Sequence, residues 1–180
     1  MKKLLIILTL IGSLSITLLA QSTDDYNKGE VFAGYSTWFD GDSSAMHGFN
    51  AAGVYNFHKY LGVKVEGTAA FRNQNFTVST WERKIYNVAA GVQVKNNRKE
   101  QVFRPFGHVL FGYGEYRSKT RAANTTFEFT EKGASFTVGG GLDFKVTDKI
   151  DIRAAQVDVT RILGADRIDI RFSTGVIFKF

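Results

Sequence analysis

The residues most able to take part in chemistry are three histidines, His47, His58 and His108, which are scattered along a chain of 180 residues. A histidine that acts as a general base in a hydrolase needs a nucleophile within hydrogen-bond reach. No His-x-Ser sequence occurs, and Ser43 and Ser44 precede His47 at a spacing that many loops show. The sequence therefore predicts no catalytic residue.

Metal and cofactor sites are not predicted either. The chain has no cysteine, which excludes thiolate ligands and disulfides, and three scattered histidines do not form a ligand set. Residues 139–141 are three glycines, but no helix or lysine follows them as in a phosphate-binding loop. We expect these glycines to permit close packing inside a strand.

The N-terminus has the pattern of an export signal. Lys2 and Lys3 give a positive start, residues 4–19 are an apolar run, and Ala20 precedes a polar stretch. We predict a signal peptide over 1–20 and a short N-terminal segment over 21–28. A transmembrane anchor is the alternative, because the run is nearly long enough to cross a bilayer. Polar residues at 21–25, with no basic flank, favour the signal.

The charge of the remaining chain is mildly basic. The full sequence has 23 Lys and Arg against 17 Asp and Glu, so removal of Lys2 and Lys3 leaves 21 against 17, a net charge of +4. These basic residues are spread out and match no recognition motif, so no nucleic-acid partner is predicted.

Beyond the signal, apolar and polar residues alternate with a period of two, which is typical of strands. At the C-terminus only Ile177 interrupts the polar face of such a strand. Its apolar face carries Ile168, Ile170, Phe172, Thr174, Val176, Phe178 and Phe180. The same alternation occurs at 134–146 and 84–95, and no stretch reads as a membrane helix.

Eight strands are expected in one domain over 29–180. They lie near 29–39, 48–58, 61–72, 84–95, 102–117, 133–146, 150–160 and 166–180. Most reach 11 residues or more, which suits a tilted strand that crosses a bilayer. A change of phase around Ala155 and Gln156 predicts a bulge.

The predicted connections alternate between short and long. Short turns are expected at 58–60 and 147–149 and a moderate one at 96–101, whereas linkers are expected at 40–47, 73–83, 118–132 and 161–165. This alternation is expected of an outer-membrane barrel with periplasmic turns and extracellular loops. Strand-end aromatics should form interfacial girdles, and the candidates are Trp38, Phe57, Tyr60, Trp81 and Tyr116.

Side-chain volume predicts which face points outward. The apolar face includes Phe71, Tyr86, Phe111, Tyr113, Phe136, Phe144, Phe172, Phe178 and Phe180, too much volume for the interior of an eight-stranded barrel. A soluble, lipocalin-like barrel is therefore disfavoured. The other face has many small residues, and its charged residues can pair across a lumen. The predicted lumen network comprises Lys64, Glu66, His108, Asp143, Arg153, Asp169 and Arg171.

The stretch 172–180, which alternates and ends in an aromatic residue, resembles the assembly signal of outer-membrane barrels, with Phe172, Val176, Phe178 and Phe180 as its apolar positions. Residues 30–36, 48–63 and 104–107 look like the strands of the OmpA/OmpX-type outer-membrane β-barrel domain family. The resemblance implies an all-β, eight-stranded antiparallel up-and-down transmembrane barrel, with the barrel-assembly machinery and periplasmic chaperones as partners during biogenesis. A peptidoglycan-binding module is not expected.

Three functions are compatible with such a barrel. The first is a monomeric, non-enzymatic surface protein with its lumen plugged by polar and charged side chains. The second is a narrow transport pore, and the third is an enzyme that modifies outer-membrane lipids, for which no nucleophile and base pair is found. The sequence leaves the biological role open.

Two of the predicted linkers, 73–83 and 118–132, contain alternating residues such as Phe127 and Phe129. Either they are solvated loops, or the strands continue beyond the bilayer as a protruding sheet that offers an edge to an extracellular protein partner. Basic residues nearby are candidates for contact with lipopolysaccharide phosphates. They are Arg72, Arg83, Lys84, Arg117, Lys119 and Arg121.

Overall fold

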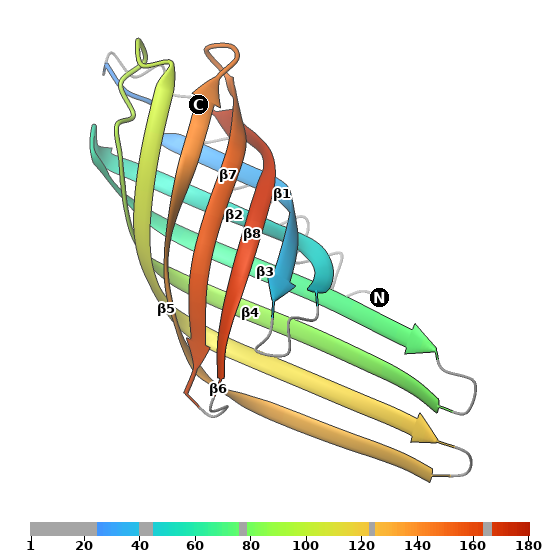
Figure 1. The fold of residues 1–180 in the computed structure, drawn as a ribbon. Coiled ribbons are helices and arrows are strands. Elements are labelled where there is room, and N and C mark those ends of the chain that lie inside the picture. The colour runs from blue at the N-terminus through green and yellow to red at the C-terminus, as the bar shows by residue number, and fades with distance from the viewer. Residues whose placement is uncertain (1–24, 40–44, 76–78, 123–124, 164–166) are drawn as a thin grey trace, which may run out of the picture.

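Eight antiparallel strands close into one barrel (Figure 1). The computed structural model describes residues 25–39, 45–75, 79–122, 125–163 and 167–180, so the predicted signal peptide lies outside the described residues. The strands are β1 Gly29–Phe39, β2 Ala45–His58, β3 Leu61–Asn75, β4 Ser79–Lys95, β5 Phe103–Ala122, β6 Thr125–Lys145, β7 Ile150–Ile162 and β8 Arg167–Lys179. Each strand pairs with the strands that precede and follow it in the sequence, and β1 pairs with β8 to close the ring. The predicted up-and-down barrel is confirmed.

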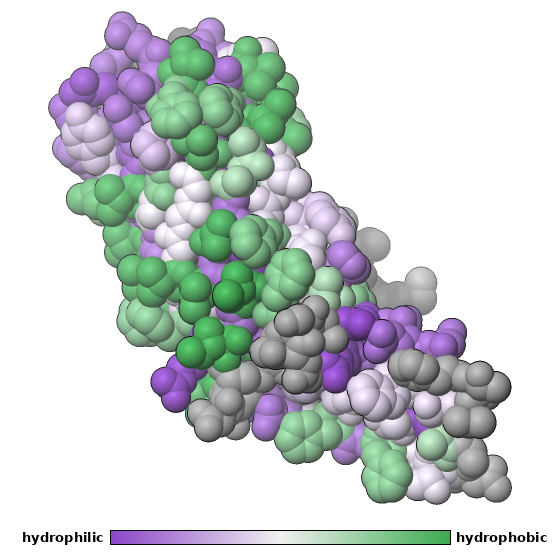
Figure 2. Space-filling model, viewed as in Figure 1, coloured by the Kyte–Doolittle hydropathy of each residue, from purple (hydrophilic) through white to green (hydrophobic). Residues whose placement is uncertain are grey.

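Alternation along each strand decides which side chains face outward. In β8, Phe172 and Phe178 are exposed on the outer wall, whereas Arg171 is buried inside. Figure 2 shows apolar side chains spread over the visible wall of the barrel. An apolar exterior around a polar interior is the inverse of a soluble barrel, so the lipocalin-like alternative is wrong. In the part of the chain that the structure describes, no helix is long and apolar enough to cross a membrane.

The predicted bulge in β7 is confirmed. Pairing with β8 shifts between Arg153 and Gln156, and pairing with β6 shifts between Leu142 and Asp143. Two successive residues, Ala154 and Ala155, therefore face outward. The bulge changes the inward positions of β7 from odd to even numbers.

The two ends of the barrel differ. One end, the turn end, holds the connections β2–β3, β4–β5 and β6–β7 together with the start of β1 and the end of β8. There Gly29 N donates to Phe180 O at 2.9 Å and Phe180 N donates to Gly29 O at 3.0 Å, which closes the barrel up to its last residue. The opposite end, the loop end, holds the other four connections.

At the loop end the four middle strands run past the rest of the barrel (Figure 1). The last β2–β3 pair is His47 with Phe71, and the last β6–β7 pair is Ser135 with Ile162. Beyond these pairs β3, β4, β5 and β6 continue together as a protruding sheet, defined here as residues 72–75, 79–83, 118–122 and 125–134. The prediction of linkers at 73–83 and 118–132 is therefore wrong for the described residues, and the alternative of continuing strands is right.

Candidate functional site: the lumen and the protruding sheet

The structure buries all seven residues of the predicted lumen network. They are Lys64, Glu66, His108, Asp143, Arg153, Asp169 and Arg171, each no more than 4% exposed. They lie on five strands, β3, β5, β6, β7 and β8, and they project into the same interior. All of them except Asp169 belong to two linked clusters of polar and charged groups.

The first cluster centres on Arg171 and two carboxylates. Arg171 pairs with Glu66, and its Nε lies 2.8 Å from Asp158 Oδ2. Lys64 Nζ lies 2.7 Å from Glu66 Oε2. These pairs connect β3, β7 and β8 across the lumen, where low dielectric makes an unpaired charge costly.

His108 belongs to the same cluster. Its Nε2 lies 2.9 Å from Asp158 Oδ1, and its Nδ1 lies 3.4 Å from Lys64 Nζ. The ring therefore lies between a carboxylate and an ammonium group. His108 is thus a bridging residue within an ion-pair cluster, in agreement with its expected placement beside polar partners.

The second cluster lies nearer the turn end. Lys95 Nζ is 2.6 Å from Glu30 Oε2 and 3.0 Å from Asp143 Oδ2. Arg153 donates to both oxygens of Asp143, at 2.8 and 3.0 Å. Glu30 and Lys95 therefore complete a four-residue set of alternating charge.

Arg153 also joins the two clusters. Its Nη1 donates to Gln156 Oε1 at 2.6 Å, and Gln156 Nε2 donates to Asp158 Oδ2 at 2.6 Å. The guanidinium lies between two aromatic rings, 4.4 Å from the centroid of Phe32 and 4.1 Å from that of Phe106. Arg153 therefore combines bidentate pairing with two cation–π contacts.

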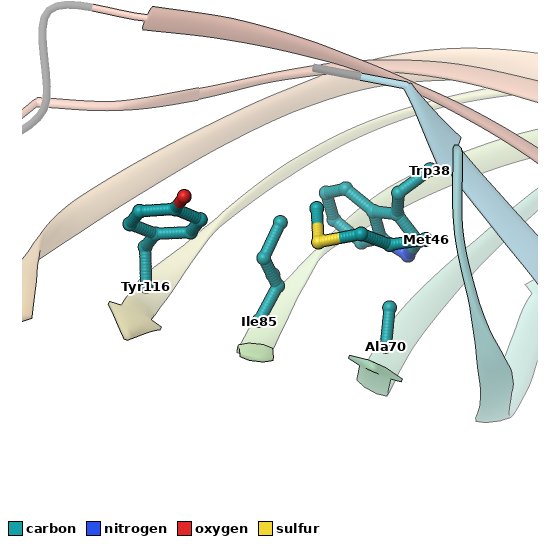
Figure 3. Packing of buried hydrophobic residues seen from close by; sticks show 5 residues of the cluster. All are labelled: Trp38, Met46, Ala70, Ile85 and Tyr116. Atoms are coloured by element: carbon teal, nitrogen blue, oxygen red, sulfur yellow. The ribbon is translucent and has the colours of Figure 1, made fainter. Parts of the chain in front are cut away.

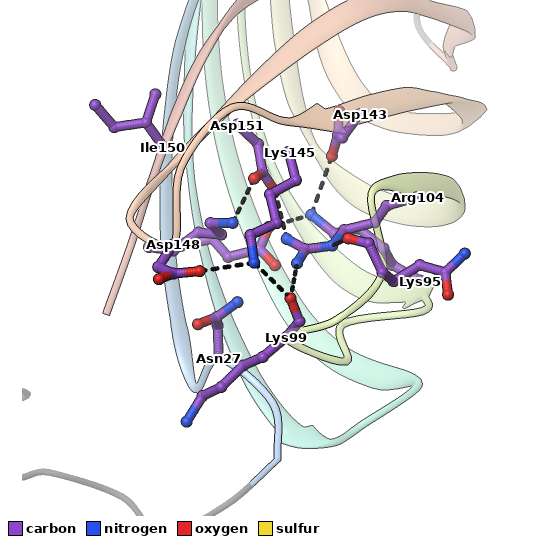
Figure 4. Close-up of polar contacts among 12 residues, drawn as sticks. Asn27, Lys95, Lys99, Arg104, Asp143, Lys145, Asp148, Ile150 and Asp151 are labelled. Carbon is purple, nitrogen blue, oxygen red and sulfur yellow. Dashed lines mark hydrogen bonds and ion pairs between the residues drawn. The ribbon is translucent and has the colours of Figure 1, made fainter.

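Close to the turn end, Arg104 connects the lumen to the β4–β5 connection (Figure 4). It pairs with Asp151 at 2.6 Å and donates to the carbonyl oxygens of Gln101 at 2.9 Å and Arg98 at 3.1 Å. Lys179 also pairs with Asp151. The connection is thereby held over the mouth of the barrel.

The buried charges balance. Six cationic residues and six acidic residues are buried among the described residues, apart from His108. The network predicted from the sequence did not include Glu30, Lys95, Arg104, Asp151, Gln156, Asp158 and Lys179. Alternation along β4 and β8 is enough to place Lys95 and Lys179 inside the lumen. Asp158 is placed there only when the bulge in β7 is taken into account, because the bulge shifts the inward positions to even numbers.

An apolar layer lies inside the lumen toward the loop end. Trp38, Met46, Ala70, Ile85 and Tyr116 pack together, and the first four are 0% exposed (Figure 3). The prediction that Trp38 and Tyr116 belong to an interfacial girdle is therefore wrong, because their strand positions point inward. Phe57, Tyr60 and Trp81 are exposed. A smaller cluster of Phe32, Ala52 and Ile177 explains the apolar interruption in β8.

Gly139 illustrates why the interior needs small residues. A Cβ at this position would collide with the Asp158 carboxylate and with the Val157 carbonyl. The glycine run at 139–141 lies within β6. It leaves room for the ion pairs of the lumen, which agrees with close packing and not with a phosphate loop.

The six basic residues at the loop end lie on two faces. Ile85 and Tyr116 point inward, so by alternation Arg72 and Arg83 lie on the lumen-side face of the sheet, directly opposite each other. The other four, Lys84, Arg117, Lys119 and Arg121, lie on the bilayer-side face. The structure thus brings four of the predicted residues together and separates the other two.

The bilayer-side face carries acidic residues as well. Arg117 pairs with Glu115, Lys119 lies 3.4 Å from Glu128, and Arg121 lies 3.5 Å from Glu82. The side chains of these ion pairs are partly exposed to solvent, so the attraction within each pair is weak. Anionic ligands can therefore compete for the cations.

Among the described residues, the other two histidines contact tyrosines. His47 Nδ1 lies 2.5 Å from Tyr35 Oη, and His58 Nδ1 accepts from Tyr60 N at 3.3 Å. Ser43 and Ser44 lie outside the described residues. Among the residues that the structure does describe, no three His, Asp or Glu side chains are grouped to hold a metal ion.

An apolar outer wall around an interior that carries paired charges defines a small outer-membrane β-barrel. The outer membrane protein beta-barrel domain model matches residues 6–176, and the chain belongs to this family. No curated protein matches the chain.

Solved structures show the same fold. Ail of Yersinia pestis, solved with the heparin analogue sucrose octasulfate, is 19% identical over 86% of this chain and 99% of its own, with a TM-score of 0.67. Neisserial surface protein A is 14% identical over 84% and 96%, with a TM-score of 0.62. The N-terminal barrel of Pseudomonas aeruginosa OprF is 13% identical over 86% and 99%, with a TM-score of 0.54. The resemblance to small OmpA/OmpX-type barrels is confirmed.

Proposed function

We propose that the protein is a non-enzymatic surface protein whose filled barrel holds the protruding sheet outside the cell, where the sheet contacts partners. The protruding sheet is the observation that carries this proposal. Short turns and both chain ends of such barrels typically lie on the periplasmic side, so the loop end faces outward. Four strands then extend past the wall of the barrel into the medium.

A plugged lumen is part of this proposal. Twelve charged side chains of balanced sign, with an apolar layer toward the loop end, support an interior without a continuous water path. Single-channel recording in planar bilayers tests it, and we expect no large stable currents. Such currents in the wild-type protein would favour a narrow transport pore instead.

The absence of lipid-modifying activity is also proposed. The burial of His108 among the charges of the lumen supports it, because a lipid substrate does not reach a ring that is 4% exposed inside the barrel. His47 Nδ1 lies beside Tyr35 Oη, and a tyrosine next to a histidine is not the nucleophile and base pair of a lipid hydrolase. Pure protein incubated with lipopolysaccharide or phospholipid should yield no product by mass spectrometry. Turnover that disappears when His47 or His108 is substituted would overturn the proposal.

We further infer that the bilayer-side cations bind lipopolysaccharide phosphates. Lys84, Arg117, Lys119 and Arg121, called here the bilayer-side cations, lie on the bilayer-side face together with Lys132. Cations on this face attract anionic groups at the membrane surface. The complex of the Ail protein with the heparin analogue sucrose octasulfate supports an anionic ligand, because that protein has the same fold. Arg72 and Arg83, on the opposite face, are not part of this contact.

A matched pair of variants tests the lipopolysaccharide contact. Substitution of the four bilayer-side cations by Gln should weaken association with lipopolysaccharide vesicles, and the loss should be smaller at high salt because screening already weakens the wild type. The control replaces Arg72 and Arg83 by Gln and should behave as wild type. Equal loss in both variants would show that the side of the sheet does not matter.

Partner contact is tested by shortening the sheet. Deletion of 122–130 removes the tip of the β5–β6 pair but leaves the barrel residues in place. We expect normal barrel assembly with weaker adhesion to host cells or extracellular matrix. Full adhesion by the shortened protein would refute a surface role for the protruding sheet.

Assembly through the C-terminal strand is proposed as well. Phe172, Val176, Phe178 and Phe180 all lie on the outer face and are at least 37% exposed. This apolar row lies on the last strand, which closes the barrel by pairing with β1. Before β1 and β8 pair, the row is accessible to the barrel-assembly machinery. Periplasmic chaperones would shield the same row during transit.

A further inference from the structure

Two phenylalanines on the protruding sheet are exposed beyond the last β6–β7 pair. Phe127 is 67% exposed and Phe129 is 55% exposed, and both belong to β6, the strand at the edge of the sheet. By register they lie on the lumen-side face, in rows with Trp81 and Arg83. Apolar residues gathered on one exposed face mark an interaction site.

Among the described residues, no strand pairs with the β7 side of β6 beyond Ser135. Ala134 O accepts from Leu163 N at 2.8 Å, so the polar backbone groups of Ala134 point toward the β7 side. Backbone groups alternate in direction along an antiparallel strand. Those of Thr126, Glu128, Thr130 and Lys132 therefore point to the same side, where β7 has already ended at Ile162.

Side chains on the other face of this edge carry opposite charges. Glu128 and Lys132 lie on the bilayer-side face, four residues apart, and both are exposed. A strand added antiparallel to β6 would place one residue opposite each of them and one opposite each phenylalanine. Cross-strand neighbours of this kind select their partners by charge and by apolar contact.

We propose, on the basis of the proposed surface function, that the open edge of β6 binds an extended segment of another protein with a defined pattern. In the direction of the added strand, an acidic residue lies opposite Lys132, an apolar residue opposite Phe129, a basic residue opposite Glu128 and an apolar residue opposite Phe127. Main-chain hydrogen bonds supply affinity, and the alternation supplies specificity.

A second copy of this chain does not fit the pattern. The antiparallel arrangement that places Phe127 opposite Phe129 of another copy also places Glu128 opposite its own counterpart. An in-register parallel arrangement brings the same two carboxylates together. Like charges directly opposite each other destabilise a pair of strands. The antiparallel register that pairs Glu128 with Lys132 of a second copy instead places Phe129 opposite Glu131 and Phe127 opposite Gly133. None of these arrangements satisfies both the charge pairs and the apolar pairs, so a different chain is the partner.

The test uses the full-length mature chain in phospholipid nanodiscs and three labelled peptides of equal composition. The matching peptide is Glu-Lys-Thr-Val-Lys-Val-Thr. The charge-exchanged peptide is Lys-Lys-Thr-Val-Glu-Val-Thr, and the third, Glu-Lys-Val-Val-Lys-Thr-Thr, has adjacent valines that cannot share one face. We expect the matching peptide to bind about 5- to 10-fold more tightly than either control, because two cross-strand pairs change in each.

Two variants make the test independent of folding. Glu128→Lys should reverse the preference between the matching and charge-exchanged peptides. Thr130→Pro removes an N–H from the open edge and not from the β5–β6 pairing, so the sheet should persist while all peptides lose binding. A heat-modifiable band confirms that each variant is folded.

The outcomes separate this inference from the proposed function. Equal binding of all three peptides, or an unchanged preference in Glu128→Lys, would overturn the side-chain pattern. Absence of binding by every peptide would overturn strand addition at β6. If adhesion to cells still depends on 122–130 in either case, the surface role stands and only the nature of the partner is wrong.

Discussion

Replacement of Arg153 by methionine should destabilise the barrel more than any single surface change. Arg153 is 1% exposed, donates twice to Asp143 and once to Gln156, and lies between the rings of Phe32 and Phe106. Methionine keeps an unbranched apolar stem in the same space. The variant therefore removes the guanidinium with little change in packing volume.

The size of the effect follows from those contacts. Hydrogen bonds to charged groups contribute about 1.5 to 3 kcal/mol each, and removal of one partner of a buried pair costs about 3 to 5 kcal/mol. Asp143 keeps Lys95 at 3.0 Å, so its carboxylate is not left without a cation. We expect the free energy of unfolding to fall by about 3 kcal/mol, the low end of that range.

Two companion variants apportion the loss. Arg153→Lys keeps the charge but not the bidentate geometry or the stacking, so it should cost about half as much. A double-mutant cycle with Asp143→Asn should give a coupling energy of about 2 kcal/mol. Urea unfolding in phospholipid vesicles, followed by tryptophan fluorescence, measures wild type and the four variants, which are Arg153→Met, Arg153→Lys, Asp143→Asn and the Arg153→Met/Asp143→Asn double variant. If Arg153→Met lies within about 0.5 kcal/mol of wild type and the coupling is near zero, the lumen is solvated and the ion pairs do not fill it.

Three further predictions concern assembly, compactness and pH. Deletion of Phe180 should lower the amount of protein in the outer membrane more than it lowers export, because both backbone bonds to Gly29 are lost with the terminal ring; equal membrane levels on immunoblots would contradict this. Unboiled protein should migrate as a compact band that shifts on heating, and the lack of a shift would argue against a closed barrel. The hydrogen bond from Lys145 lowers the pKa of Asp148 in the exposed β6–β7 turn. The Lys145–Asp148 pair gives a small stabilisation at pH values above the usual pKa range of Asp. This stabilisation is lost as pH falls through the lowered pKa of Asp148. The stabilities of wild type and Asp148→Asn should therefore become equal in acid unfolding.

Much of the barrel is predictable from the sequence, because a strand in a bilayer must alternate between lipid and lumen. The alternation at 168–180 fixed the face of Phe172 and Arg171, and the burial of Arg171 agrees with it. The phase change near Ala155 indicated the bulge. Side-chain volume predicted the outward face without any knowledge of the pairing register.

Only the tertiary structure decided which residues meet. Glu66 and Arg171 are far apart in sequence, and closure of the barrel by β1 and β8 is what brings β3 and β8 across one lumen. The sequence predicted Trp38 to be an interfacial aromatic. In the structure its position along β1 points into the lumen, where it packs against Met46 and Ile85. The extent of the protruding sheet was equally open, since short alternating segments fit either loops or strands. Pairing with a neighbour, such as Ser118 with Phe129, stabilises the strand form, and that pairing is not local information.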